Sequence, residues 1–98
     1  MEFLVELEVV GTSALSEARL RELRIAEAAR AQQLAAAGSL IRLWRPRESG
    51  WRNVGLWRAD SEAHLRKIMA TLPMAPYIRI RCRALDPHPS DPAPPLSR

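Results

Sequence analysis

One carboxylate of this chain lies where the helical pattern predicts an apolar side chain. Residues 17–37 contain no glycine or proline and are rich in alanine, which is typical of a helix. Projected at about 100° per residue, this segment places Glu27 inside an inward-facing stripe formed by Leu20, Leu23, Ala31 and Leu34. Burial raises the pKa of a carboxylate, and such a carboxylate can act as a general base near neutral pH. Glu27 is therefore the leading candidate for a catalytic group.

Arg24 lies one helical turn before Glu27, at the margin of the same stripe. At a spacing of i,i+3 it can pair with Glu27, or it can face an anionic substrate. If Arg24 or Arg30 neutralises Glu27, the acid has a structural role only, and the nearby cation lowers its pKa. Both interpretations stay open at this point.

The other ionisable groups give weaker signals. The two histidines, His64 on a predicted helix and His88 in a Pro-rich tail, are far apart, which is typical of surface or packing residues. Cys82 alternates inward with Ile78 and Ile80, which favours a small core residue. The sequence has no Gly-rich phosphate loop, no nucleophile elbow and no metal-ligand spacing, so we expect neither a metal nor a cofactor.

Composition narrows the class of protein. The chain has 98 residues, 47% of them hydrophobic and 27% charged, with a formal net charge of +4, which fits one small globular domain. It lacks an apolar run of membrane-spanning length and a secretory leader, so we expect no membrane association. A single cysteine cannot form a disulfide framework, which favours the cytoplasm.

Alternation and helix signals predict six elements in the order β-α-β-β-α-β. The predicted strands cover residues 2–10, 39–47, 51–59 and 77–85. The helices are capped by Ser16 and by Asp60 or Ser61, and they run to about Ala37 and Leu72. This order predicts an α+β, ferredoxin-like fold: a four-stranded antiparallel sheet with both helices on one face. We expect a domain over residues 1–86 and a Pro-rich C-terminal arm or tail over residues 87–98.

In this topology the first and last strands should be neighbours in the centre of the sheet. Glu6 and Glu8 would then face Arg79 and Arg81 across the strands, within reach of ion pairs. The pattern also places several residues on the helix-free face, namely Arg42, Trp44, Trp51, Asn53, Gly55 and Trp57. An exposed tryptophan patch of this kind favours packing against another subunit, and exposed Ile25 suggests a second contact surface.

A basic sheet with aromatic residues is also typical of RNA-recognition modules. Their aromatic residues are Phe and Tyr on the first and third strands, beside glycine. The span WRNVGLWR at residues 51–58 does not match that signature, so we expect no nucleic-acid partner.

A more specific pattern runs along the chain, and residues 23–45 and 70–90 carry most of it. Its motifs, in order, are Leu43-Trp44-Arg45, Asn53, Leu72-Pro73, Pro76-Tyr77 and His88-Pro89-Ser90. In this order and spacing the chain resembles the muconolactone Δ-isomerase family from its first strand to about Ser90. The resemblance implies a ferredoxin-like fold and assembly into a ring, typically a decamer. It also implies a C-terminal segment that reaches a neighbouring subunit, and a pocket where subunits meet.

The resemblance further implies a cofactor-free reaction on a small anionic lactone. In that family, muconolactone is converted to 3-oxoadipate enol-lactone, in the catechol branch of aromatic catabolism, by an allylic proton shift. Position by position, Glu27 matches the base and Arg24 a catalytic cation where lysine is usual. Asn53 fits an amide donor to the lactone oxygen, and three residues fit the pocket wall or carboxylate contacts: Trp44, Arg45 and Tyr77.

Two departures from the family pattern leave the substrate open. Arginine stands at position 24, and the turn PRESGWRN at residues 46–53 lacks a His-containing turn. The alternatives are an enzyme that acts on another lactone, by dehalogenation or biosynthetic isomerisation, and a non-catalytic oligomeric protein that binds a small anion.

Overall fold

The chain folds in the predicted β-α-β-β-α-β order. The structure is a computed structural model, and it describes residues 1–48 and 50–93. Its elements are β1 (Glu2–Val9), α1 (Glu17–Ala36), β2 (Leu40–Trp44), β3 (Arg52–Arg58), α2 (Glu62–Ala70), a short 3-10 turn (Ala75–Tyr77) and β4 (Ile78–Leu85). Each observed strand and α-helix lies inside its predicted range, and β2 is shortened most because Pro46 follows its end. The 3-10 turn was not predicted, and it includes Tyr77, which was expected to begin the last strand. The predicted turn at residues 48–50 includes Ser49, which lies outside the described residues.

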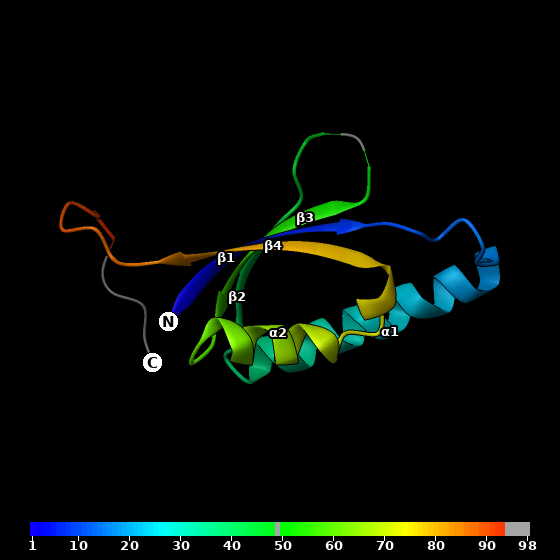
Figure 1. The fold of residues 1–98 in the computed structure, drawn as a ribbon, viewed down its shortest axis with the longest axis horizontal. Coiled ribbons are helices and arrows are strands. Elements are labelled where there is room, and N and C mark those ends of the chain that lie inside the picture. Colours follow the sequence, from blue (N-terminus) through cyan, green and yellow to red (C-terminus); the bar gives the residue numbers. More distant parts are fainter. Residues whose placement is uncertain (49, 94–98) are drawn as a thin grey trace.

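The four strands form one antiparallel sheet in the order β2-β3-β1-β4. Both helices cover the same face of this sheet, as Figure 1 shows. This arrangement confirms the ferredoxin-like prediction. One detail was wrong: β1 and β4 are neighbours, but β4 lies at an edge and β3 shares the centre with β1.

The residues that begin and end the helices are largely those predicted from the sequence. The Ser16 side chain accepts a hydrogen bond from the Arg19 N–H at 3.0 Å, and that of Ser61 accepts one from the His64 N–H at 3.1 Å. Each bond satisfies an N–H that has no partner inside its helix. Ser61, and not Asp60, is therefore the cap of α2. Gly38 follows α1 with a φ of 85°, the left-handed conformation that favours glycine.

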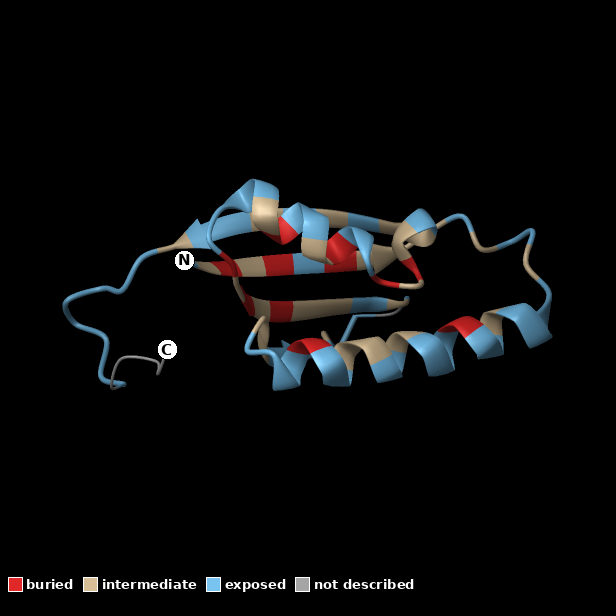
Figure 2. Ribbon diagram, turned by 90° about the horizontal axis from the view of Figure 1, so that it is seen from below, coloured by how far each residue is buried: buried red, intermediate tan, exposed pale blue. Residues whose placement is uncertain are grey.

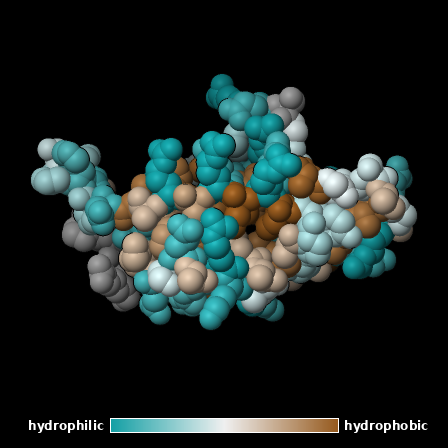
Figure 3. All heavy atoms as spheres, in the orientation of Figure 1, coloured by the Kyte–Doolittle hydropathy of each residue, from teal (hydrophilic) through white to brown (hydrophobic). Residues whose placement is uncertain are grey.

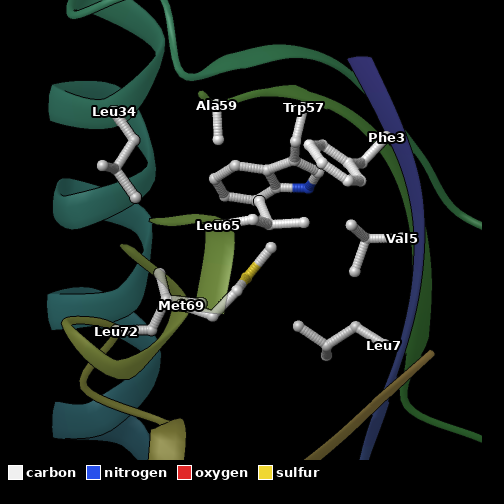
Figure 4. Packing of buried hydrophobic residues seen from close by; sticks show 9 residues of the cluster. All are labelled: Phe3, Val5, Leu7, Leu34, Trp57, Ala59, Leu65, Met69 and Leu72. Atoms are coloured by element: carbon white, nitrogen blue, oxygen red, sulfur yellow. The ribbon is translucent and has the colours of Figure 1, made fainter. Parts of the chain in front are cut away.

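The core lies between the sheet and the two helices. Figure 4 shows the nine clustered residues: Phe3, Val5, Leu7, Leu34, Trp57, Ala59, Leu65, Met69 and Leu72. Cys82 packs against this cluster, as predicted. Much of α1 stays exposed, as Figure 2 shows, with Leu23 and Leu34 as its buried positions. Neither helix combines the length and apolar character that a transmembrane helix needs.

The predicted orientation of β3 was wrong. Trp57 lies directly opposite Phe3, Gly55 opposite Val5, and Asn53 opposite Leu7. Opposite residues in an antiparallel pair share a face, and Phe3, Val5 and Leu7 are buried under the helices. Asn53, Gly55 and Trp57 therefore face the helices and not the open side.

Two local features place the tryptophans of β2 and β3 on different faces of the sheet. A Cβ on Gly55 would lie 2.6 Å from Nε1 of Trp57, so the absence of a side chain lets the indole lie against this strand. In β2 the register shifts between Leu40 and Arg42, which turns Arg42 and Trp44 to the open face as predicted. The tryptophans are thus divided between the two sides of the sheet.

The open face is mainly charged. Glu8 pairs with Arg52 at 2.8 Å and with Arg79 at 3.8 Å, and Glu2 pairs with Arg58 at 3.4 Å. The pair between Glu8 and Arg79 confirms one of the expected ion pairs between the first and last strands, whereas the other two pairs join β1 to β3 and were not predicted. Glu6 lies opposite Arg81 in the register but forms no ion pair among the described residues. The predicted patch of several tryptophans is absent from the described residues, because Trp57 is buried and Trp51 lies against Arg24 of α1. Trp44, 43% exposed, lies on this face, so the packing argument for an oligomer is weaker than expected.

Beyond β4 the described chain leaves the sheet, as the orange segment of Figure 1 shows. Residues 86–93 are exposed and form local hydrogen bonds, such as that from the Ser90 N–H to Nδ1 of His88 at 2.9 Å. Residues 94–98 of the predicted arm lie outside the described part of the chain.

Candidate functional site

Glu27 is held by a hydrogen bond between two distant segments. It lies on the inward side of α1 and is half-buried. Its Oε1 accepts a hydrogen bond of 2.9 Å from the backbone N–H of Met74, which is 1% exposed and precedes the 3-10 turn. The carboxylate therefore joins α1 to the segment between α2 and β4, and its orientation is fixed.

Burial raises the pKa of the Glu27 carboxyl group above its usual value. The hydrogen bond from Met74 lowers this pKa, but its effect is smaller than that of burial. The direction matches the sequence prediction. This shift brings the pKa of the Glu27 carboxyl group closer to the near-neutral pKa that suits a general base.

The alternative in which an arginine neutralises Glu27 was wrong. The guanidinium carbon of Arg24 lies 4.3 Å from the ring centroid of Trp51. Arg30 instead donates to Oγ1 of Thr71 from Nε and Nη2, at 3.1 and 2.9 Å. Glu27 forms no ion pair with any residue that the structure describes.

A pocket rich in arginine lies beside this part of α1. It measures about 500 Å³ and is lined by Arg24, Arg45, Gly50, Trp51 and Arg52. Arg45 follows β2 and Trp51 precedes β3, so the end of the β2–β3 hairpin brings these residues to the helix. Arg24, predicted as a catalytic cation, and Arg45, predicted to contact the substrate, thus share one pocket.

The remaining predicted site residues occupy different places. Asn53 is half-buried on the sheet face that the helices cover. Tyr77 lies in the 3-10 turn, where its N–H donates to the Met74 carbonyl at 2.7 Å and its own carbonyl accepts from Val10 at 2.7 Å. Trp44 lies on the opposite sheet face, where the guanidinium carbon of Arg42 lies 5.0 Å from its ring centroid. One chain therefore does not place Trp44 beside Glu27.

Two groups of the candidate site were not predicted from the sequence: the ring of Trp51 and the backbone N–H of Met74. Trp51 lies two residues before Asn53, and the correct orientation of β3 would have placed both on the helix side. The Met74 N–H could not be found, because nearly every residue has an N–H and its use depends on the fold.

A hollow between the sheet and the helices is visible in Figure 3, with hydrophobic residues around it. A second groove, of about 590 Å³, is lined mainly by the open face and the β2–β3 loop. Its charges are mixed, with Glu6, Glu8 and Glu48 beside three arginines. Across residues 1–48 and 50–93 no cluster of three or more His, Cys, Asp or Glu side chains could hold a metal ion.

Comparisons with known proteins agree on one family. The family model described as muconolactone delta-isomerase matches residues 1–91. Muconolactone Delta-isomerase 2 of Acinetobacter lwoffii is 33% identical over 90 residues, which cover 92% of this chain and 93% of the relative. Muconolactone Delta-isomerase of Acinetobacter baylyi is 28% identical, with the same coverage of each chain.

The structural comparison extends this agreement to the fold. The crystal structure of a muconolactone isomerase superposes with a TM-score of 0.84 and 27% sequence identity, covering 97% of this chain and 98% of that one. The resemblance read from the sequence, and the class of enzyme that it implies, are confirmed. This chain belongs to the muconolactone delta-isomerase family of enzymes.

Proposed function

We propose that this chain isomerises muconolactone to 3-oxoadipate enol-lactone, with Glu27 as the base that moves the proton. The observation that carries this proposal is the state of Glu27. Its carboxylate is half-buried, is oriented by the Met74 N–H and has no ion partner among the described residues. A base in this setting keeps its basicity, because no cation stabilises its charged form.

The chemistry needs one base and a stabilised oxyanion. The ring proton that is lost is vinylogous to the lactone carbonyl, so its transfer to Glu27 leaves a dienolate. Glu27 then returns the proton to the carbon beside the carbonyl, and the double bond has moved. Oε1 already accepts the Met74 hydrogen bond, so Oε2 is the oxygen that carries the proton. The same proton is removed and returned, so the reaction balances without an oxidant, a reductant or a cofactor.

The other predicted residues serve binding in this proposal. Arg24 and Arg45 hold the substrate carboxylate in the pocket that they share. The Asn53 amide donates to the lactone oxygen and stabilises the dienolate. Tyr77 does not line that pocket, but it adjoins the Met74 segment that holds Glu27, and in this proposal it contacts the substrate from there.

Trp44 fits this proposal only in an assembly. Since it lies on the sheet face opposite Glu27, it can contact a substrate only in the pocket of a neighbouring copy. We infer a cytoplasmic ring, a decamer, in which subunits complete one another's pockets and residues 87–98 act as an arm. Ile25, 68% exposed on α1, offers a further contact surface for such a ring. Light scattering of the purified protein tests the assembly.

The runner-up proposal is a relative that acts on another lactone, or that binds a small anion without catalysis. The observation that favours it is arginine at position 24, in a pocket that contains two further arginines. Arginine presents a fixed planar fork, so this pocket suits an anion geometry that a lysine site would not select.

One assay separates these proposals. The purified protein is incubated with muconolactone, and formation of the enol-lactone is followed by ultraviolet absorbance. Turnover that depends on Glu27 supports the isomerase. An intact oligomer that binds the lactone acid without turnover would contradict it and favour the small-anion binder.

A further inference from the structure

The stack between Arg24 and Trp51 joins two parts of the fold that are far apart in sequence. Arg24 lies on α1, and Trp51 directly precedes β3. The guanidinium carbon is 4.3 Å from the ring centroid. A cation over an indole face within about 6 Å is attracted by the ring quadrupole, and tryptophan gives the strongest such attraction.

The arginines of this pocket differ in their partners. Arg52 is paired with Glu8 at 2.8 Å. In the part of the chain that the structure describes, neither Arg24 nor Arg45 forms an ion pair. Two arginines without anionic partners, in one pocket of about 500 Å³, provide positive charge for a carboxylate.

We propose that Trp51 is a positioning residue, which holds the Arg24 guanidinium in an anion site shared with Arg45. The site takes the carboxylate of a small lactone acid, and in this respect the inference rests on the proposed function. An unpaired arginine side chain loses rotamer freedom when it binds an anion, and a prior stack reduces that loss. A guanidinium stacked by its face still presents its N–H edge to a carboxylate.

A stack on Trp51 also explains how arginine can stand where the family resemblance places lysine. A lysine ammonium is a compact, strongly hydrated point charge on a flexible stem, whereas the planar guanidinium stacks well on an aromatic ring. Trp51 and Arg24 would thus work as a matched pair that fixes the direction of the positive charge. Selectivity should therefore favour the free acid over its neutral ester.

Calorimetric titration with the saturated analogue of muconolactone, which has no double bond to shift, tests the anion site directly. Trp51→Leu keeps an apolar side chain but removes the ring, and it should weaken binding of the acid by about 3- to 10-fold. Trp51→Phe should fall between the wild type and Trp51→Leu. Binding of the methyl ester should not change, and neither should acid binding by Arg19→Met, a control on an exposed arginine of the same helix.

A double-mutant cycle separates positioning from a merely structural role. If Trp51 acts through Arg24, Trp51→Leu should have no further effect on acid binding in the Arg24→Met background. In turnover of muconolactone, Trp51→Leu should raise KM and leave kcat unchanged. If Trp51→Leu loses its helical circular dichroism, the cycle is completed with Trp51→Phe.

Two results would overturn the proposal: equal effects of the Trp51 variant in both backgrounds, or equal affinity of the wild type for acid and ester. Failure of the isomerase function is distinguishable from both. A wild type that binds the saturated acid but does not convert muconolactone would refute catalysis and leave the anion site intact.

Discussion

Replacing Glu27 with glutamine should separate its catalytic role from its structural one. The amide oxygen of the introduced side chain can still accept the Met74 hydrogen bond of 2.9 Å, so the link between α1 and the α2–β4 segment should survive. The amide is not basic, so the proton shift loses its general base. Loss of a general base costs about 10²- to 10⁴-fold in rate, which corresponds to about 3–5 kcal/mol in the activation barrier.

Alanine at the same position supplies the matched comparison. Glu27→Ala also abolishes the base, but it leaves the buried Met74 N–H without its acceptor. An unsatisfied buried donor costs about 1–3 kcal/mol of stability. Glu27→Gln should therefore lose the base while its midpoint of urea unfolding at neutral pH stays at or above that of the wild type, because the neutral amide carries no burial penalty. Glu27→Ala should lose the base and unfold at a lower urea concentration than Glu27→Gln.

The two assays are steady-state turnover of muconolactone and urea unfolding followed by circular dichroism. Turnover by Glu27→Gln within about tenfold of the wild type, well short of the loss expected for a missing base, would refute the base assignment. Equal stability of the alanine and glutamine variants would refute the structural part, because it would mean that the Met74 bond contributes nothing.

Further predictions concern stability. Because burial raises the pKa of Glu27 in the folded chain, the native state holds more protons than the unfolded state at pH values between the two pKa values. Stability conferred by protonated Glu27 should thus be lost as pH rises through that window, and the loss should disappear in Glu27→Gln when unfolding is followed from about pH 4 to 7. Gly55→Ala should destabilise by about 1–3 kcal/mol, measured by urea unfolding, since its Cβ would lie 2.6 Å from the Trp57 indole nitrogen; a neutral effect would show that the indole moves freely. Ser16→Ala should cost about 1 kcal/mol through loss of the α1 cap, as a lower thermal midpoint would report.

Most of the fold followed from local patterns. The four predicted strands, together with helix caps at Ser16 and at Asp60 or Ser61, gave the order of the elements. The opposition of Glu8 and Arg79 followed from the topology. These features depend on neighbours in sequence or on a single strand pairing, which periodicity captures well.

The orientation of β3 was less predictable for a physical reason. Its two faces carry Val54 and Leu56 on one side and Gly55 and Trp57 on the other, so hydropathy alone does not decide which side is buried. Pairing with β1 decided it, because Phe3 and Val5 are buried and lie opposite Trp57 and Gly55.

The candidate site was predicted unevenly for the same reason. The helical projection identified Glu27, since its unusual feature is local to α1. Its hydrogen bond to Met74 joins residues 47 positions apart, and the stack of Arg24 on Trp51 likewise joins α1 to the start of β3. Such contacts arise only from tertiary packing. The sequence therefore indicated Glu27 as the candidate base, while the structure showed which N–H orients its carboxylate.

The most direct test of Glu27 as the base is the pH dependence of kcat/KM, which reports ionisations of the free enzyme. Measured with the methyl ester of muconolactone, it avoids ionisation of the substrate's own carboxyl group. If Glu27 is the base, the rate rises with pH through one ionisation, with an apparent pKa above the usual value of 4.5 for a glutamate, as burial of Glu27 requires. A rate that is independent of pH from about 4 to 8, or one that falls over that range, would contradict Glu27 as the base.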